Sequence, residues 1–283
     1  MVSIETFKKI LKLDQNGLKK LVFDYLKNTN KYNPMYGDGF VYAKGDIPIL
    51  LVAHLDTVHK TKPKNIYYDE QQGVMWSPEG IGGDDRCGVY IITKLIEEFK
   101  PYVLFTEDEE IGCVGAKKTI DTIIDPNVKF IIEIDRRGSN DCVFYDCGNK
   151  EFKEYIESFG FKTALGSYSD ICTLSEEWEV ASVNLSSGYY NEHTLQETIN
   201  VNDMTKTYER VKKILADKDS KYFDYKKVEH TTYPTLVKED KEDYKKTKKD
   251  LDNYRYYDSY GYVDSDGFYR SWDGRKIEDD CLR

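Results

Sequence analysis

Residues 47–56 read IPILLVAHLD, and this stretch decides the fold of the chain. Its first seven residues are almost wholly apolar and do not alternate with polar ones, which is typical of a strand buried on both faces of an α/β sheet. His54 and Asp56 follow where such a strand would end. In open α/β folds, ligands bind at the carboxyl ends of the strands. The stretch therefore predicts a buried strand with a functional site at its end.

Acidic residues also follow two other apolar runs. Residues 102–105 precede the acidic stretch 106–112, and residues 128–132 precede Asp135. A buried carboxylate costs free energy unless it is paired or bound to metal. Five stretches supply nitrogen and carboxylate ligands for two divalent ions, with a spare carboxylate as base: 54–57, 83–88, 106–112, 134–135 and 191–194. They predict a metal centre at the strand ends.

The bulk composition narrows the classes of partner. The 283 residues can bury one large core or two small ones, and their net charge of −10 argues against binding to nucleic acid or to anionic membranes. No apolar run is long enough to cross a bilayer, and the N-terminus lacks the apolar core of a signal peptide. Six scattered cysteines favour reduced thiols, although Cys142 and Cys147 could pair. We expect a cytoplasmic protein with no nucleic-acid or membrane partner.

Hydrophobic periodicity predicts alternating helices and strands. The expected helices lie within residues 3–30 (two of them), 84–100 and 202–216, and the expected strands lie at 39–42, 47–54, 66–68 and 74–76. Strand and helix patterns alternate over 102–106, 116–122, 128–134, 141–146, 150–159 and 180–185. This order is typical of an α/β protein, a three-layer α/β/α sandwich with a mixed, mainly parallel central sheet.

The composition changes after Asp217. Residues 218–283 hold ten of the 24 tyrosines and few aliphatic residues, and residues 238–250 are almost all charged. Such a segment cannot bury a core of its own. We expect a catalytic domain over 1–217 and a Tyr-rich, charged extension over 218–283, either partly disordered or packed as an arm on the domain or on another subunit of a homo-oligomer. Residues 260–272 suit a small hairpin.

Three phrases resemble a known superfamily. Residues 52–58 (VAHLDTV), 82–88 (GGDDRCG) and 106–116 (TEDEEIGCVGA) are similar to the motifs of the co-catalytic di-zinc exopeptidases. These include bacterial leucyl aminopeptidase-like enzymes, tetrahedral aminopeptidases and glutamate carboxypeptidase-like metallohydrolases. Ser169-Asp170 and residues 192–194 match more loosely, so the resemblance covers about residues 35–217. It implies a single catalytic domain, because neither the 30 positions from His54 to Asp84 (84 − 54) nor the 58 from Asp135 to His193 (193 − 135) has room for a lid.

The resemblance also implies roles for individual residues. It assigns His54 and Asp135 to one metal, Glu110 and His193 to the other, Asp84 as the bridge, Glu109 as the uncoordinated general base, and Asp56 as the partner of the His54 ring. Asp85 then caps the following helix. The nitrogen and oxygen ligands suit two zinc ions, and also cobalt or manganese.

The implied function is hydrolysis of a peptide or amide bond, with a peptide or small amide as substrate, by an aminopeptidase-type exopeptidase. An N-acyl amino acid deacylase or carboxypeptidase-type amidohydrolase is the alternative, and a non-catalytic binding protein on the same fold is the rival from another class. Ala53 and Ile171 depart from the family pattern, which has Gly and His there, and leave the substrate open.

Four other side chains lie near or beyond the motifs. We expect a solvent-exposed His59 and no metal role for His230 in the charged tail. Tyr189 and Tyr190 precede His193, and they either line the pocket or pack in the core.

Overall fold

A computed structural model describes residues 2–28 and 32–228, together with 257–258, 261–263 and 269–271. By their contacts, the residues of the chain form two units: 1–165 with 169–228, and 166–168 with 229–283. All the residues of the predicted metal centre lie in the first unit. That unit runs to Val228, so the beginning of the Tyr-rich extension belongs to it.

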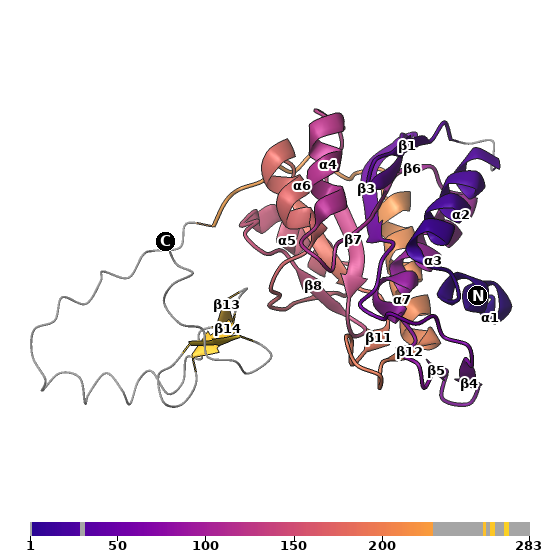
Figure 1. Ribbon diagram of the computed structural model, residues 1–283. Coiled ribbons are helices and arrows are strands. Elements are labelled where there is room, and N and C mark those ends of the chain that lie inside the picture. The colour runs from indigo at the N-terminus through magenta and orange to yellow at the C-terminus, as the bar shows by residue number, and fades with distance from the viewer. Residues whose placement is uncertain (1, 29–31, 229–256, 259–260, 264–268, 272–283) are drawn as a thin grey trace, which may run out of the picture. The chain divides into compact units, whose positions relative to one another are not determined.

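An eight-stranded mixed sheet forms the middle of the first unit (Figure 1). In spatial order its strands are β1 (Met35–Gly37), β2 (Phe40–Ala43), β6 (Pro101–Thr106), β3 (Ile47–His54), β7 (Ile131–Arg136), β10 (Ser182–Ser186), β8 (Asp141–Val143) and β9 (Lys162–Thr163). Strands β6, β3, β7 and β10 pair in parallel, as do β8 and β9. The pairings β1–β2, β2–β6 and β8–β10 are antiparallel. The predicted mixed, mainly parallel sheet is confirmed.

Helices cover both faces of this sheet and complete the predicted three layers (Figure 1). The larger core receives side chains from α1 (Ile4–Leu11), α2 (Gln15–Asn28), α3 (Gly83–Glu98), α5 (Lys150–Glu157) and α7 (Val201–Ala216). The smaller core receives them from α4 (Val114–Thr122) and α6 (Asp170–Trp178). Strand β3 lies between the two cores, which explains its unbroken apolar run: Leu51 faces the larger core and Leu50 the smaller.

A second, antiparallel sheet lies in the same unit. Its order is β11 (Tyr189–Tyr190), β12 (Thr198–Asn200), β5 (Val74–Trp76) and β4 (Tyr67–Asp69). The connection from β11 to β12 carries His193, so this small sheet fixes both ends of the loop that holds the predicted ligand. The hairpin β4–β5 is predicted from the sequence, whereas β1, β9, β11, β12 and helix α6 are not.

The first part of the extension, residues 218–228, packs on the rest of the first unit. Phe223 is buried, and its ring centroid lies 5.1 Å from that of Phe152. Its backbone binds the segments just before β10 and β7. Its carbonyl accepts a hydrogen bond from Ala181 N, and its N–H donates to Lys129 O. In the second unit, β14 (Gly261–Val263) and β15 (Tyr269–Ser271) pair antiparallel, and β13 (Tyr257–Asp258) joins β14. The predicted hairpin is confirmed. Residues 229–256, with His230, lie outside the described residues.

Two further expectations concern the described residues alone. Their five cysteines, Cys87, Cys113, Cys142, Cys147 and Cys172, are all free thiols. None of their helices combines the length and the apolar character that crossing a membrane would need.

Candidate metal centre

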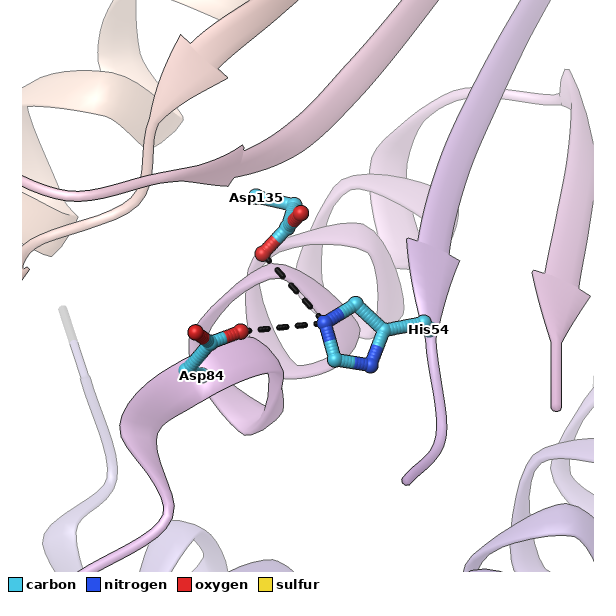
Figure 2. A group of neighbouring side chains, drawn as sticks. All are labelled: His54, Asp84 and Asp135. Atoms are coloured by element: carbon cyan, nitrogen blue, oxygen red, sulfur yellow. Dashed lines mark hydrogen bonds and ion pairs between the residues drawn. The ribbon is translucent and has the colours of Figure 1, made fainter. Parts of the chain in front are cut away.

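The first group of candidate ligands gathers at the carboxyl edge of the central sheet. His54 ends β3, Asp135 lies near the end of β7, and Asp84 lies at the start of α3. Nε2 of His54 is 3.0 Å from Oδ1 of Asp84 and 3.4 Å from Oδ1 of Asp135. Figure 2 shows both carboxylates directed at this one ring nitrogen. The three ligand atoms lie within 4.8 Å of one another, close enough to share one metal ion.

A second group uses the other oxygen of Asp84. Nε2 of His193 lies 3.4 Å from Oδ2 of Asp84 and 3.0 Å from Oε2 of Glu110. These atoms again lie within 4.8 Å of one another. The two groups therefore have one member in common, and each has its own histidine and its own further carboxylate. A carboxylate that presents one oxygen to each of two groups has the geometry of a bridging ligand.

Asp56 connects the first group to the acidic stretch 106–112. Its Oδ1 lies 3.2 Å from Nδ1 of His54, on the side of the ring away from the other carboxylates. The same carboxylate accepts hydrogen bonds from the backbone N–H groups of Glu109 (3.0 Å) and Glu110 (3.1 Å). A carboxylate on the far ring nitrogen sets the tautomer and orientation of a ligating histidine. Asp56 is placed to do this and also to hold the loop that carries the predicted base.

Asp135 has a separate set of supports from β10, β11 and α6. Its backbone N–H donates to Asn184 Oδ1 at 2.9 Å, and the Tyr189 hydroxyl donates to its carboxylate at 3.2 Å. Oγ of Ser169 lies 3.3 Å from Oδ2 of the same carboxylate. Tyr189 is buried in the larger core, which agrees with core packing, and from there its hydroxyl reaches the Asp135 carboxylate. Tyr190 instead donates to Asp203.

Asp85 and Gly88 determine how α3 begins and how close it lies to β7. Oδ1 of Asp85 accepts a hydrogen bond from Gly88 N at 2.9 Å, which is the predicted capping role. Asp84 and Asp85 have non-helical backbone angles, and the peptide bond between them is cis. A Cβ on Gly88 would lie 2.1 Å from the carbonyl oxygen of Ile134. Glycine is required there because α3 passes against the backbone of β7, which brings Asp84 close to Asp135.

The electrostatics show a surplus of negative charge. Hydrogen bonds that the His193 ring donates to Asp84 and Glu110 raise the pKa of His193 to about 11. Burial raises the pKa of Glu109 to about 9, helped by Asp135 and Asp170 although His54 opposes the rise. Burial and the neighbouring Asp84 raise the pKa of Asp135 to about 7. Protons are thus held where so many carboxylates meet, because each bound proton reduces the repulsion between them.

The residues present fit two divalent cations. Asp56, Asp84, Glu110 and Asp135 converge on only two histidines. Oε1 of Glu110 is buried and has no hydrogen-bond partner among the described residues. Cations bound between these groups would compensate both the surplus charge and the unpaired oxygen. Imidazole and carboxylate donors suit zinc, cobalt or manganese.

Several solved structures with a similar fold are peptidases. Aminopeptidase PepT from Bacillus cereus superposes with a TM-score of 0.64 at 14% identity, covering 76% of this chain and 98% of that one. A tripeptidase from Staphylococcus aureus gives 0.63 at 12% identity, with 75% and 96% covered. The TET1 peptidase of Pyrococcus horikoshii gives 0.55 at 14% identity, with 75% and 98% covered. The chain has the fold of these peptidases. No protein-family model and no curated protein matches the sequence.

A cleft of about 570 Å³ opens beside the centre of this peptidase fold. Asp56 and Glu110 form part of its wall, together with residues 57–63, the turn 80–82, Ile111 and the α1–α2 connection at Leu13, Asp14 and Gln15, among others. Pockets of 300–1,000 Å³ hold small organic ligands. The N-terminal helices, which the motif resemblance does not cover, thus contribute to the cleft.

The structure corrects the expectation for His59. Its side chain is only 8% exposed, and its Nε2 lies 2.8 Å from Oε2 of Glu197, so it is not a solvent-exposed residue. Its position just beyond the motif of residues 52–58 does not reveal this, because its partner is distant in sequence. Glu197 itself is absent from the predicted site. The one signal for it is its position four residues after His193, a spacing with no meaning before the fold is known.

Proposed function

We propose that this protein is a two-metal hydrolase that removes residues from the N-terminus of peptides. The observation that carries the proposal is the division of the Asp84 carboxylate between two ligand groups, with Glu109 half-buried beside them. The fold shared with aminopeptidases supports the same conclusion. The ions are proposed to be zinc, one held by His54, Asp84 and Asp135 and the other by Asp84, Glu110 and His193.

Glu109 is the proposed general base. It neighbours the proposed ligand Glu110 in a turn, where the carbonyl of Glu109 accepts hydrogen bonds from the N–H groups of Gly112 and Cys113. Its own N–H donates to Asp56, which holds the backbone of Glu109 beside the centre. Two divalent ions bound there would supply Lewis-acid chemistry, acidifying water and polarising a carbonyl. A carboxylate of Glu109 accepts the proton of the attacking water and returns it to the leaving amine.

The cleft beside the centre is the proposed substrate site. Its wall includes the apolar side chains of Val58 and Ile111, which are 40% and 74% exposed, as well as Lys60. Thr57 also lines it. A peptide in the cleft would find an apolar surface next to the reacting bond.

The choice between aminopeptidase and deacylase is tested with matched substrates. Aminoacyl amides with a free α-amino group and their N-acetylated counterparts are compared at equal concentration with zinc-loaded protein. An aminopeptidase hydrolyses the free amides faster. Faster hydrolysis of the acetylated members identifies a deacylase, and no hydrolysis of either set supports the non-catalytic binding protein. The Glu109→Gln protein serves as the blank for contaminating peptidases.

The proposal extends to assembly. The TET1 peptidase of Pyrococcus horikoshii can assemble into a tetrahedron or a large octahedral shell. We propose a homo-oligomer for this chain, with contacts made through the Tyr-rich extension. Light scattering of the full chain and of a chain ending at Val228 gives the comparison: a smaller particle for the shorter chain is the expected result, and equal subunit numbers exclude the extension as the contact.

A further inference from the structure

Glu197 is a buried carboxylate that belongs to neither ligand group. It lies four residues after His193, and its side chain has no exposed surface. Its Oε1 accepts a hydrogen bond from the backbone N–H of Asp84 at 2.9 Å. Its Oε2 accepts one from the N–H of Gly82, also at 2.9 Å, and lies 2.8 Å from Nε2 of His59. One side chain thus binds three groups from segments far away in the sequence.

The backbone that Glu197 holds is the one that presents the shared ligand. Gly82 has left-handed backbone angles, with φ of 66°, and Asp84 has non-helical ones, so no regular helical hydrogen bonding fixes this segment. The two N–H groups point at Glu197 instead. A shift of this backbone would move both oxygens of Asp84, and each oxygen faces a different ligand group.

His59 completes the arrangement from the other side. Its ring packs against Gly80, where an added Cβ would lie 2.4 Å from the ring. The ring is therefore confined while its Nε2 meets Glu197. Glu197 is itself part of the loop that carries His193. Its hydrogen bonds therefore connect that loop to the segment 82–84. It links a ligand of the second group directly to the ligand shared by both.

We propose that Glu197 is a positioning residue that sets the affinity of both metal ions through Asp84, with His59 holding its carboxylate. The inference rests on the proposed two-metal centre. Removal of a residue that acts on metal ligands from outside the coordination sphere typically costs 10- to 100-fold in metal affinity. Because Asp84 is shared, the loss applies to both ions, whereas loss of a ligand that serves one ion weakens that ion alone.

The test uses the Glu197→Gln and Glu197→Ala proteins as full chains. Glutamine keeps one acceptor oxygen but turns an NH₂ group toward the second N–H, so it can satisfy only one of the two backbone donors. Both zinc dissociation constants are measured by competition with a chromophoric chelator, and far-ultraviolet circular dichroism confirms folding. Both constants are expected to rise by about 10- to 100-fold in each variant. The matched control is Glu192→Gln, which alters a carboxylate of the same loop that pairs with Arg137, and its constants should stay within about twofold.

The outcomes separate the inference from the proposed function. If the folded Glu197→Gln and Glu197→Ala proteins have the zinc dissociation constants of the wild type, the positioning role is overturned. A loss of affinity for only one of the two ions overturns it as well. A wild-type protein that binds no zinc contradicts the metal centre itself. Should neither Glu197 variant fold, His59→Gln provides the second test: both constants are expected to rise, by less than for Glu197→Ala, and unchanged constants overturn the proposal.

Discussion

Nε2 of His193 lies 3.4 Å from Oδ2 of Asp84, although 109 positions separate the two residues in the sequence (193 − 84). The histidine comes from the loop of the small antiparallel sheet, and the aspartate from the start of α3. Their meeting places the second ligand group next to the first. The imidazole is 53% exposed, so it contributes little to the core and can be removed without leaving a cavity.

The His193→Ala protein should therefore fold normally and lose one ion. The group of His54, Asp84 and Asp135 keeps all its members, whereas Asp84 and Glu110 alone bind a divalent ion weakly. Metal content after gel filtration should fall from two ions per chain to one. The Glu192→Gln protein, altered at the preceding position, should retain two. A His193→Ala protein that also retains two ions would remove His193 from the ligand set.

The Glu109→Gln protein should retain both ions and lose turnover. A general base contributes about 10²- to 10⁴-fold to a rate, and glutamine of nearly the same shape cannot accept the proton. The measurement is kcat on an aminoacyl amide together with metal content. Glu110→Gln is the matched neighbour and should instead lose metal. Wild-type turnover in the Glu109→Gln protein would end the assignment of the base.

A buried ion pair also holds the acidic stretch 106–112. Nζ of Lys19 on α2 lies 2.5 Å from Oε2 of Glu107, and the two side chains are 7% and 9% exposed. Lys19→Met leaves a buried carboxylate without its cation, which costs about 3–5 kcal/mol of unfolding free energy. Lys62→Ala breaks an exposed pair with Asp14 and should cost less than about 1 kcal/mol. Urea unfolding measures the unfolding free energy of both proteins. Equal losses would show that the buried pair stabilises the fold no more than the exposed pair does.

The end of the first unit predicts where the chain can be shortened. A chain that ends at Val228 keeps Phe223 in its aromatic cluster with Phe130 and Phe152, and should fold and bind two ions. A chain that ends at Asp217 loses that ring, at a cost of about 3–5 kcal/mol by analogy with Phe→Ala changes in cores. Thermal unfolding distinguishes them. Loss of metal from the folded Val228 chain would place a ligand in the extension.

The sequence predicts the layers of the fold because its strongest signals are local. The run before His54 and the helical periodicity of residues 84–100 each require a buried strand or an amphipathic helix. Helix α6 escapes prediction because it is only nine residues long and presents just three large apolar side chains to the core, Ile171, Leu174 and Trp178. Strands β11 and β12 are too short for periodicity to reveal.

The site shows the same division between local and distant information. Motif resemblance supplies His54, Asp84, Glu110, Asp135 and His193, and the structure brings these five together. Glu197 and the supports of Asp135 act through contacts between segments far apart in sequence, so no local pattern marks them. The error for His59 has the same origin, since its burial depends on Glu197, 138 positions away.

Metal content measured together with activity tests the account most directly. The protein is stripped with a chelator, dialysed, and titrated with zinc while hydrolysis of an aminoacyl amide is followed. The shared Asp84 predicts that two ions bind per chain, that the stripped protein is inactive, and that Asp84→Asn binds both ions more weakly. No bound zinc in the metal-replete protein, or undiminished hydrolysis by the stripped protein, would contradict the two-metal centre.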